Sequence, residues 1–446
     1  MGAERTKKDL NIRVDCLTRV EGHGTIVVDM KQGKLETCSL NVVESPRFFE
    51  ALLRGRSVFE AQHITSRICG ICACGHSLAS IQAAEDALGL TPTAQTMRLR
   101  RLLLHLEILD SHILHIYLLV MPDLAGVKSF VPLIHTHNEL VRRALRMKKA
   151  CNNVMEVLVG RHVHPISLIV GGFTKLPQPQ DLAMMHDVLT GLRPDMDATI
   201  ELLSTLTFPD FERETEYVGL VSDDNEYPLL SGDIGSSDGV RMKKQDYQKA
   251  TNEYIVPYSS AKHTKLSRDS FAVGSLARFN LNHAKLHPKA SGAAAALNLK
   301  PKCANPFLNT LAQAVESVHC LEDAITIIED LQSVGVNQDE QVVVGVNERM
   351  TLPVQAGEGV GAVEVPRGIL YHHYQVDDSG TIEQANCVIP TNQNLSNIEQ
   401  DMRALIPTVL HKSEEEITAT LEMLVRAYDP CISCSTHLLD VRFMGR

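Results

Sequence analysis

The chain has 446 residues, a formal net charge of −11 at pH 7, 44% hydrophobic residues and only 4% aromatic residues. This apolar content is typical of a globular protein and excludes disordered and collagen-like classes. The acidic balance argues against sequence-independent binding of nucleic acid, which needs a basic face. Because tryptophan is absent and aromatics are few, aliphatic helical packing is favoured over an aromatic-rich β-sandwich.

The first predicted element is a β-hairpin over residues 23–44, in which β-branched and apolar residues flank a turn at Gln32-Gly33. Shorter helices are expected over 47–61 and 77–88. Long helices with the apolar spacing of buried elements are predicted over 94–121, 131–158, 178–206 and 305–333. Several long helices of this kind indicate a central bundle.

The stretch 217–300 combines glycines with mixed charges, and we interpret it as a peripheral insertion. Residues 360–390 predict a second hairpin, and the last helices are expected at about 395–409 and 414–427. The sequence therefore predicts a mainly helical α+β fold in which a single domain over 1–446 surrounds its helical bundle with peripheral β-hairpins.

No segment is predicted to span a membrane. The most apolar stretch, 102–121, contains three histidines, one glutamate and one aspartate, and their burial in lipid would be costly. Residues 1–16 carry charges but no apolar core of a signal peptide. We therefore expect a cytoplasmic protein.

Eleven cysteines are present, and four of them form two Cys-x-x-Cys pairs near opposite ends of the chain. The first pair is Cys69 with Cys72, and the second is Cys431 with Cys434. An odd number of cysteines without a secretion signal does not indicate a disulfide framework. Four thiolates are a complete ligand set for a soft metal ion, and the position of the first pair before a predicted helix favours thiolates there.

The spacing of the pairs bears on the kind of metal site. A structural zinc ribbon usually has its pairs ~12–20 residues apart, because the metal substitutes for a core. Here the pairs lie hundreds of residues apart in a chain with ample core material. An iron–sulfur cluster also takes four cysteines. Any shared site requires that the fold bring both ends of the chain together.

Six motifs, in chain order, resemble those of [NiFe]-hydrogenase large subunits. They are Arg19-Val20-Glu21-Gly22-His23-Gly24, Arg47-Phe48-Phe49-Glu50 with Gly55-Arg56, Arg67-Ile68-Cys69-Gly70-Ile71-Cys72 with His76, His164-Pro165 with Gly171-Gly172, Glu364-Val365-Pro366-Arg367-Gly368, and Asp429-Pro430-Cys431-Ile432-Ser433-Cys434 with His437. The resemblance spans nearly the whole chain and points to the soluble, cytoplasmic, multi-subunit branch. It implies the hydrogenase large-subunit fold and reversible heterolytic cleavage of H2 to protons and electrons.

The resemblance also implies a nickel–iron centre. By position, Cys69 and Cys431 match terminal nickel ligands, and Cys72 and Cys434 match the cysteines that bridge nickel to iron. In this family the iron also carries one carbonyl and two cyanide ligands. Soft, charge-donating sulfur stabilises the redox states through which the nickel must pass.

Residues around this centre are matched in the same way. Arg367 and Thr391 match positions beside the cyanides, where a guanidinium offsets buried negative charge. Asp123 and Asp429 match positions around Arg367 and the metal centre. His76 matches a histidine that hydrogen-bonds a bridging sulfur. For each of them, a purely structural hydrogen bond is the alternative.

Proton transfer and a second metal are implied at other positions. Cys431 is the implied first proton acceptor, and Glu21 matches the glutamate that takes the proton onward, a role that burial supports by raising a carboxyl pKa. Glu50 and His437 match ligands of a buried Mg²⁺, or of iron in some relatives, with a main-chain carbonyl near Cys387.

The end of the chain carries two implied features. Residues 429–437 form the C-terminal metal-binding motif, and residues 438–446 follow it as a tail that a maturation endopeptidase could remove. After Arg367 the chain has Tyr371-His372-His373, where other branches of the family have Gly-His followed by an aromatic residue.

The remaining seven cysteines form no ferredoxin-type run, so no iron–sulfur cluster is expected in this chain. Electrons must then leave through an iron–sulfur small subunit and further flavin or iron–sulfur subunits. NAD(P), coenzyme F420, ferredoxin and a heterodisulfide reductase are all open as acceptors. Two alternatives are kept: a subunit like the quinone module of respiratory complex I, and a non-catalytic, zinc-stabilised scaffold.

Overall fold

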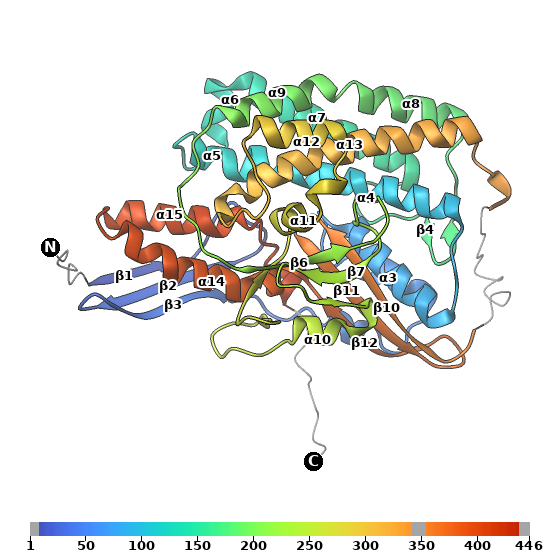
Figure 1. The fold of residues 1–446 in the computed structure, drawn as a ribbon. Coiled ribbons are helices and arrows are strands. Elements are labelled where there is room, and N and C mark those ends of the chain that lie inside the picture. The colour runs from blue at the N-terminus through green and yellow to red at the C-terminus, as the bar shows by residue number, and fades with distance from the viewer. Residues whose placement is uncertain (1–8, 341–353, 437–446) are drawn as a thin grey trace, which may run out of the picture.

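The computed structural model describes residues 9–340 and 354–436, and Figure 1 shows a layer of long helices beside a group of smaller sheets. The central bundle contains α4 (Ala94–Leu114), α7 (Asn138–Val159), α8 (Pro179–Thr190), α9 (Arg193–Ser204) and α13 (Asn309–Val334). Helices α4 and α13 pack together, α7 lies against α4, and α8 and α9 lie against α13. The predicted, mainly helical fold with a central bundle is confirmed.

The helix predicted over 94–121 is continuous but not uniform. It runs from α4 through a π-helical turn (η2, His115–Val120) into α5 (Met121–Leu124). By length and composition, the run Ala94–Leu124 is apolar enough to cross a membrane, but most of it is buried inside the protein. Its apolar character therefore matches its place at the centre of the bundle.

Two other predicted long helices are divided. The helix predicted over 131–158 consists of α6 (Val131–Thr136) and α7. The helix predicted over 178–206 is divided at Gly191 into α8 and α9, and Pro194 in the first turn of α9 favours this break. The helix predicted over 305–333 is α13, which begins a few residues later.

The N-terminal sheet contains the predicted hairpin over 23–44 and one further strand. Its strands are β1 (Leu10–Val14), β2 (Gly24–Lys31) and β3 (Lys34–Val42), all antiparallel. Gln32 and Gly33 both have positive φ, as a tight hairpin turn requires. Helix α14 (Pro390–Val409) packs on β3, and α15 (Glu414–Ala427) contacts β1 (Figure 1). The last two predicted helices are thus confirmed.

A second three-stranded sheet supports the site. It consists of β10 (Gly357–Val365), β11 (Gly368–Val376) and β12 (Ile382–Val388) in the order β10-β11-β12. The sequence predicted only one hairpin over 360–390; the structure adds a tight turn at Pro366-Arg367 that joins β10 to β11. Helix α3 (Ala73–Leu88) packs directly on β10 and β11.

The predicted insertion, 217–300, forms a four-stranded sheet and three helices. The elements are β6 (Glu216–Val221), β7 (Asp233–Ser236), β8 (Arg241–Met242), α10 (Tyr247–Thr251), β9 (Phe271–Ala272), α11 (Ser275–Asn282) and α12 (Pro288–Ala296). Apolar residues of β6 and β7 share a separate core with β10 and β11, and α11 and α12 pack on α13. The interpretation of this stretch as an insertion stays a prediction.

The remaining elements described here are short helices and a small hairpin. The helix predicted over 47–61 is broken near Gly55 into α1 (Phe49–Leu53) and α2 (Ala61–Thr65), and a small hairpin joins β4 (Leu168–Ile169) to β5 (Gly172–Phe173). The predicted tail, 438–446, lies outside the described residues.

The close approach of α3 to β10 depends on glycine. At Gly357, Gly359 and Gly361 an added Cβ would overlap backbone atoms of Ala79, Ala83 or Ala87 in α3. We expect Gly361→Ala to lower the free energy of unfolding by about 1–3 kcal/mol or more. The overlapping atoms belong to the backbone of α3, which cannot move aside as a side chain can. Calorimetric unfolding of the full chain measures this change.

Gly292→Ala in α12 is the matched control. No atom lies within 4 Å of an added Cβ there. Alanine should therefore be neutral or stabilise the helix by about 0.5–1 kcal/mol. Similar melting temperatures for the two variants would contradict the packing argument.

Candidate metal centre

The first Cys-x-x-Cys pair lies at the start of α3. Helix α3 begins at Ala73, earlier than predicted, and Cys72 is its N-cap residue. The Ile71 N–H donates to Cys69 Sγ over 3.3 Å. The loop is held from outside by Arg47, whose side chain donates to the carbonyl of Ile68 over 2.6 Å. The pair is therefore a fixed turn that leads into a helix N-terminus, where the helix dipole favours thiolate.

The second pair lies against the N-terminal segment. Asp429 has a φ of +50° and turns the chain after α15. Glu21 and Cys431 form a parallel bridge, and the Ile432 N–H donates to the Glu21 carbonyl over 2.9 Å. The Cys431 N–H donates to Thr391 Oγ1 over 2.8 Å. The start and end of the chain are thus tied together through the backbone.

Gly22 allows this close contact. Its φ is +84°, and an added Cβ would lie 2.6 Å from the Ser433 backbone nitrogen. A side chain at this position would separate the N-terminal motif from the C-terminal pair. The contact between the two ends of the chain therefore requires a glycine at position 22 of the Arg19–Gly24 motif.

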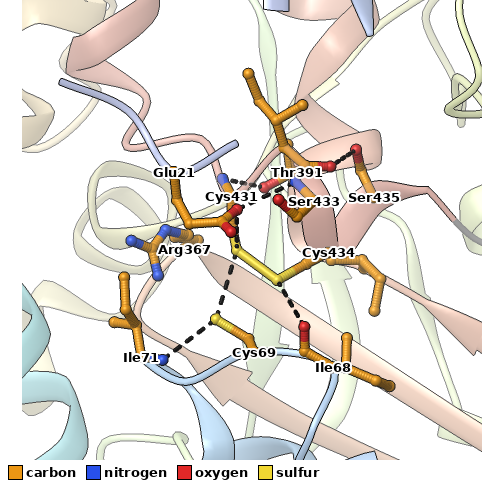
Figure 2. The surroundings of a disulfide bond; sticks show 12 residues. Glu21, Ile68, Cys69, Ile71, Arg367, Thr391, Cys431, Ser433, Cys434 and Ser435 are labelled. Atoms are coloured by element: carbon orange, nitrogen blue, oxygen red, sulfur yellow. Dashed lines mark hydrogen bonds between the residues drawn. A yellow bond between two sulfur atoms is a disulfide. The ribbon is translucent and has the colours of Figure 1, made fainter. Parts of the chain in front are cut away.

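The two pairs meet at one buried point, and Figure 2 shows Cys69, Cys431 and Cys434 of this group. Cys69 Sγ lies 3.5 Å from Cys431 Sγ. The Sγ atoms of Cys69, Cys72 and Cys434 all lie within 4.8 Å of one another. The exposed fractions of the four cysteines are between 1% and 5%. Four sulfur donors from opposite ends of the chain therefore surround a single, water-poor position.

Cys431 and Cys434 are joined by a disulfide in this structure (Figure 2). The sequence predicted thiolates at both positions, and a disulfide sulfur cannot act as a thiolate ligand. Both states are compatible with the Cys-x-x-Cys spacing. The reduced pair is the form that completes a four-thiolate set with Cys69 and Cys72.

The two thiols of the first pair differ in pKa. The hydrogen bond from Cys72 lowers the pKa of Cys69 against the opposing effect of burial, and Arg367 contributes in the same direction. The same hydrogen bond and burial raise the pKa of Cys72 well above its usual value. Cys69 is thus the more readily ionised thiol of the pair.

Arg367 supplies a buried positive charge beside the sulfur atoms (Figure 2). Its Nε donates to the Asp429 carbonyl over 2.7 Å, and its Nη2 to Asp429 Oδ1 over 3.0 Å. Burial opposes the charge, but Asp429, Cys69, Cys72 and Glu21 raise its pKa above the usual range. Nη1 is buried and has no hydrogen-bond partner within residues 9–340 and 354–436. This open donor fits an anionic group at the sulfur cluster.

Glu21 is the carboxylate next to the second pair. Its Oε2 lies 3.1 Å from Cys431 Sγ and accepts the Ser433 N–H over 3.1 Å. The backbone bridge described above fixes its position from the other side. The structure therefore places the predicted proton carrier within hydrogen-bond distance of the predicted proton acceptor.

The two predicted outer carboxylates differ in position. Asp429 contacts Arg367 directly, and its other oxygen accepts from Gln313 Nε2 over 3.2 Å. Asp123 instead accepts hydrogen bonds from Arg19 and Arg426, with Arg426 Nε at 2.7 Å. The structure thus brings Asp429, but not Asp123, into contact with Arg367.

His76 is a residue of α3, and the described residues predicted at the Mg²⁺ site lie on α1 (Glu50) and β12 (Cys387). His76 Nδ1 is 3.2 Å from Nε2 of His372, the histidine of the divergent Tyr371-His372-His373 stretch. The Cys387 N–H donates to Glu50 Oε1 over 2.8 Å, and burial raises the pKa of Glu50 to about 7. The structure brings Glu50 and Cys387 together, whereas His437 lies outside the described residues.

Glu107 of α4 is a buried carboxyl beside the first pair that the sequence motifs did not indicate. It accepts the N–H groups of Cys74 over 2.6 Å and Gly75 over 2.8 Å, in the first turn of α3. Burial raises its pKa to about 8, although these hydrogen bonds oppose the shift. Its signal in the sequence was the one glutamate of the apolar stretch 102–121. Glu107 holds the helix terminus that carries Cys72.

Two protein-family models match the sequence of this chain. The model of the nickel-dependent hydrogenase family matches residues 47–142 and 233–437, and a HoxL-like model matches residues 11–45. The chain is 32% identical to sulfhydrogenase 1 subunit alpha of Pyrococcus furiosus over 96% of this chain and 98% of that protein. It is 29% identical to NAD-reducing hydrogenase HoxS subunit beta of Cupriavidus necator over 96% of this chain and 94% of that protein.

Solved structures agree in fold. A NAD+-reducing [NiFe]-hydrogenase in its H2-reduced state superposes with a TM-score of 0.83 and 26% identity, covering 96% of this chain and 99% of that one. A [NiFeSe]-hydrogenase of Dm. baculatum superposes with a TM-score of 0.77 at 23% identity, covering 96% and 100%, which supports the fold.

Glu107→Gln tests the anchoring of α3. An amide has one acceptor oxygen where the carboxyl has two, so one buried N–H loses its partner and the free energy of unfolding should fall by about 1–3 kcal/mol. Thermal unfolding of the full chain measures the change. Glu383→Gln, at an exposed position of β12, should stay within about 0.5 kcal/mol of the unmodified protein. Equal effects of the two substitutions would argue against the anchoring role.

Proposed function

This chain belongs to the nickel-dependent hydrogenase family as a catalytic large subunit, and we propose that its two Cys-x-x-Cys pairs together hold the nickel–iron centre. In this proposal Cys69 and Cys431 are terminal nickel ligands, and Cys72 and Cys434 bridge nickel to iron. The observation that carries it is the convergence of four buried sulfur atoms, with Cys69 Sγ 3.5 Å from Cys431 Sγ. Thiolates suit a soft metal that changes redox state.

Arg367 and Thr391 are proposed to lie beside the cyanide ligands of the iron. A buried guanidinium needs a compensating anion, and one nitrogen of Arg367 still has an open donor next to the sulfur atoms. Thr391 accepts the Cys431 N–H and so fixes the second pair from this side. Asp429 in turn orients the Arg367 guanidinium. His76 and Asp123 are proposed as outer supports, with Asp123 acting through Arg426.

When bound, the nickel–iron centre supplies the redox-active metal pair at which H2 is cleaved heterolytically. The chain's own residues move the proton. Cys431 Sγ is the proposed first acceptor, and Glu21 takes the proton onward because its Oε2 is 3.1 Å away, within hydrogen-bond reach. The Ser433 N–H keeps that oxygen aimed at the sulfur.

Electrons are proposed to leave through an iron–sulfur small subunit and further flavin or iron–sulfur subunits. The cysteines outside the two pairs are scattered along the chain, and most of them are buried free thiols. The relatives named above are themselves subunits of larger hydrogenases. Among NAD(P), F420, ferredoxin and heterodisulfide reductase, the similarity to the NAD-reducing enzyme makes NAD(P) the first acceptor to test. We propose a cytoplasmic location on the same basis.

A second metal is proposed near the C-terminus. Glu50 would bind Mg²⁺, or iron, together with His437 and the main-chain carbonyl of Cys387. A buried carboxyl with its pKa raised to about 7 is stabilised as the anion by a nearby cation. In the same proposal residues 429–437 are the metal-binding motif of a single-domain chain, and a maturation endopeptidase removes the tail, 438–446.

Metal analysis of the purified complex tests the centre directly. We expect about one nickel per chain, with infrared bands of metal-bound carbonyl and cyanide, because four thiolates hold a single bimetallic site. Cys431→Ser should lose the nickel, whereas Cys16→Ser, at an exposed cysteine far from the pairs in sequence, should keep it. A complex that contains zinc and no nickel would disprove the assignment and restore the scaffold alternative.

Glu21→Gln tests proton transfer separately from metal binding. The amide keeps the size of the side chain but cannot accept the proton, so H2 oxidation should fall at least about 100-fold while nickel content is unchanged. H2-dependent dye reduction and nickel per chain are measured together. Glu36→Gln, at an exposed position of β3, is the control and should keep full activity. Normal turnover in Glu21→Gln would exclude Glu21 as the proton carrier.

A further inference from the structure

Arg367 occupies a tight turn, and we propose that Arg278 of α11 is a positioning residue that fixes this turn for catalysis. The inference rests on the proposed function, because it concerns the placement of Arg367 at the metal centre. In the sheet Val365 is paired with Gly368, so Pro366 and Arg367 alone form the connection between β10 and β11. The position of the Arg367 guanidinium therefore depends on how this two-residue turn is held.

Arg278 donates to both carbonyl groups that directly precede Arg367. Its Nη1 lies 3.0 Å from the Val365 oxygen, and its Nη2 lies 3.1 Å from the Pro366 oxygen. The Arg278 side chain is 1% exposed, so water does not compete for these hydrogen bonds. The guanidinium thus clamps the backbone of the turn from the side of α11.

Two buried carboxylates hold Arg278 itself. Nε donates to Glu316 Oε1 of α13 over 2.7 Å, and Nη1 donates to Glu364 Oε2 of β10 over 2.9 Å. His112 Nε2 of α4 lies 2.7 Å from Glu316 Oε2. The clamp therefore connects the turn to α4 and α13 at the centre of the bundle. A buried ion pair need not add net stability, but loss of one partner leaves an uncompensated charge in the core.

The far side of the turn is closely packed. Gly368 has a φ of +134°, and an added Cβ there would overlap Val273 just before α11. An added Cβ at Gly274 would lie 3.2 Å from the Arg367 carbonyl oxygen. The turn has little room to shift while α11 is in place. At the other end, Asp429 holds the Arg367 head group, so Arg278 and Asp429 fix the backbone and the side chain separately.

Lysine cannot replace Arg278 in this role. The guanidinium reaches two carboxylates and two carbonyls with a planar fork, whereas an ammonium is a single point donor on a flexible stem. In Arg278→Lys we expect H2 oxidation per bound nickel to fall between about 10- and 100-fold, the scale of a misplaced catalytic group. We also expect shifted infrared bands of the carbonyl and cyanide ligands, because the charge of Arg367 has moved relative to them.

Arg100→Lys is the matched control for loss of a buried fork. Arg100 of α4 is also 1% exposed and donates to both oxygens of Glu85, over 2.8 and 2.6 Å, and it contacts none of the proposed site residues. The Arg100→Lys substitution should lower the melting temperature while activity per nickel and the infrared bands stay unchanged. Glu316→Gln loosens the clamp without removing a buried cation, and it serves as the second test variant if Arg278→Lys does not fold.

The experiment uses the purified complex and compares nickel content, activity per nickel, infrared spectrum and melting temperature. Shifted bands and reduced activity in Arg278→Lys or Glu316→Gln, but not in Arg100→Lys, support the positioning role. If the clamp variants behave like Arg100→Lys, with altered stability alone, Arg278 is structural and the inference is wrong. An unmodified complex without nickel would instead refute the proposed function.

Discussion

The structure depends on one constraint: sulfur atoms from the two ends of the chain must lie at the same buried point. The constraint is met through backbone contact, because Glu21 pairs with Cys431 and Gly22 lets Ser433 approach without a side chain between them. The first pair reaches the same point from the N-terminus of α3. A rigid helix terminus on one side and a backbone bridge on the other can hold four donors more accurately than flexible loops.

Around the sulfur atoms, two buried arginines each lie next to buried carboxylates that balance their charge. Arg367 lies between the cysteines and Asp429, while Arg278 lies between Glu316 and Glu364 behind the Pro366-Arg367 turn. Each guanidinium has carboxylate or carbonyl partners, and Arg367 also has one buried nitrogen that finds no partner among the described residues. Uncompensated charge in such a site would be costly, so this balance supports the metal centre that we propose here.

Local sequence patterns predicted where helices and strands lie better than they predicted the breaks within the helices. The hairpin over 23–44 and the helix over 414–427 were predicted correctly because turn residues and apolar spacing are local signals. The π-helical turn at His115–Val120 was missed, since packing in the bundle decides where such a helix deforms. The break at Gly191 was missed although Pro194 is a local signal for it. Strand β1 was missed because it gains stability only by pairing with β2.

The sequence by itself determined the family, the mainly helical fold and the residues worth testing, because the cysteine pairs and their flanking motifs are short, specific strings of residues. Only the tertiary structure decided which of these residues meet. It placed Asp429, rather than Asp123, on Arg367, and it revealed Glu107 and Arg278, whose partners lie far away along the chain. The physical reason is that hydrogen bonds and buried charge pairs depend on distances in space, which residue spacing along a chain does not encode.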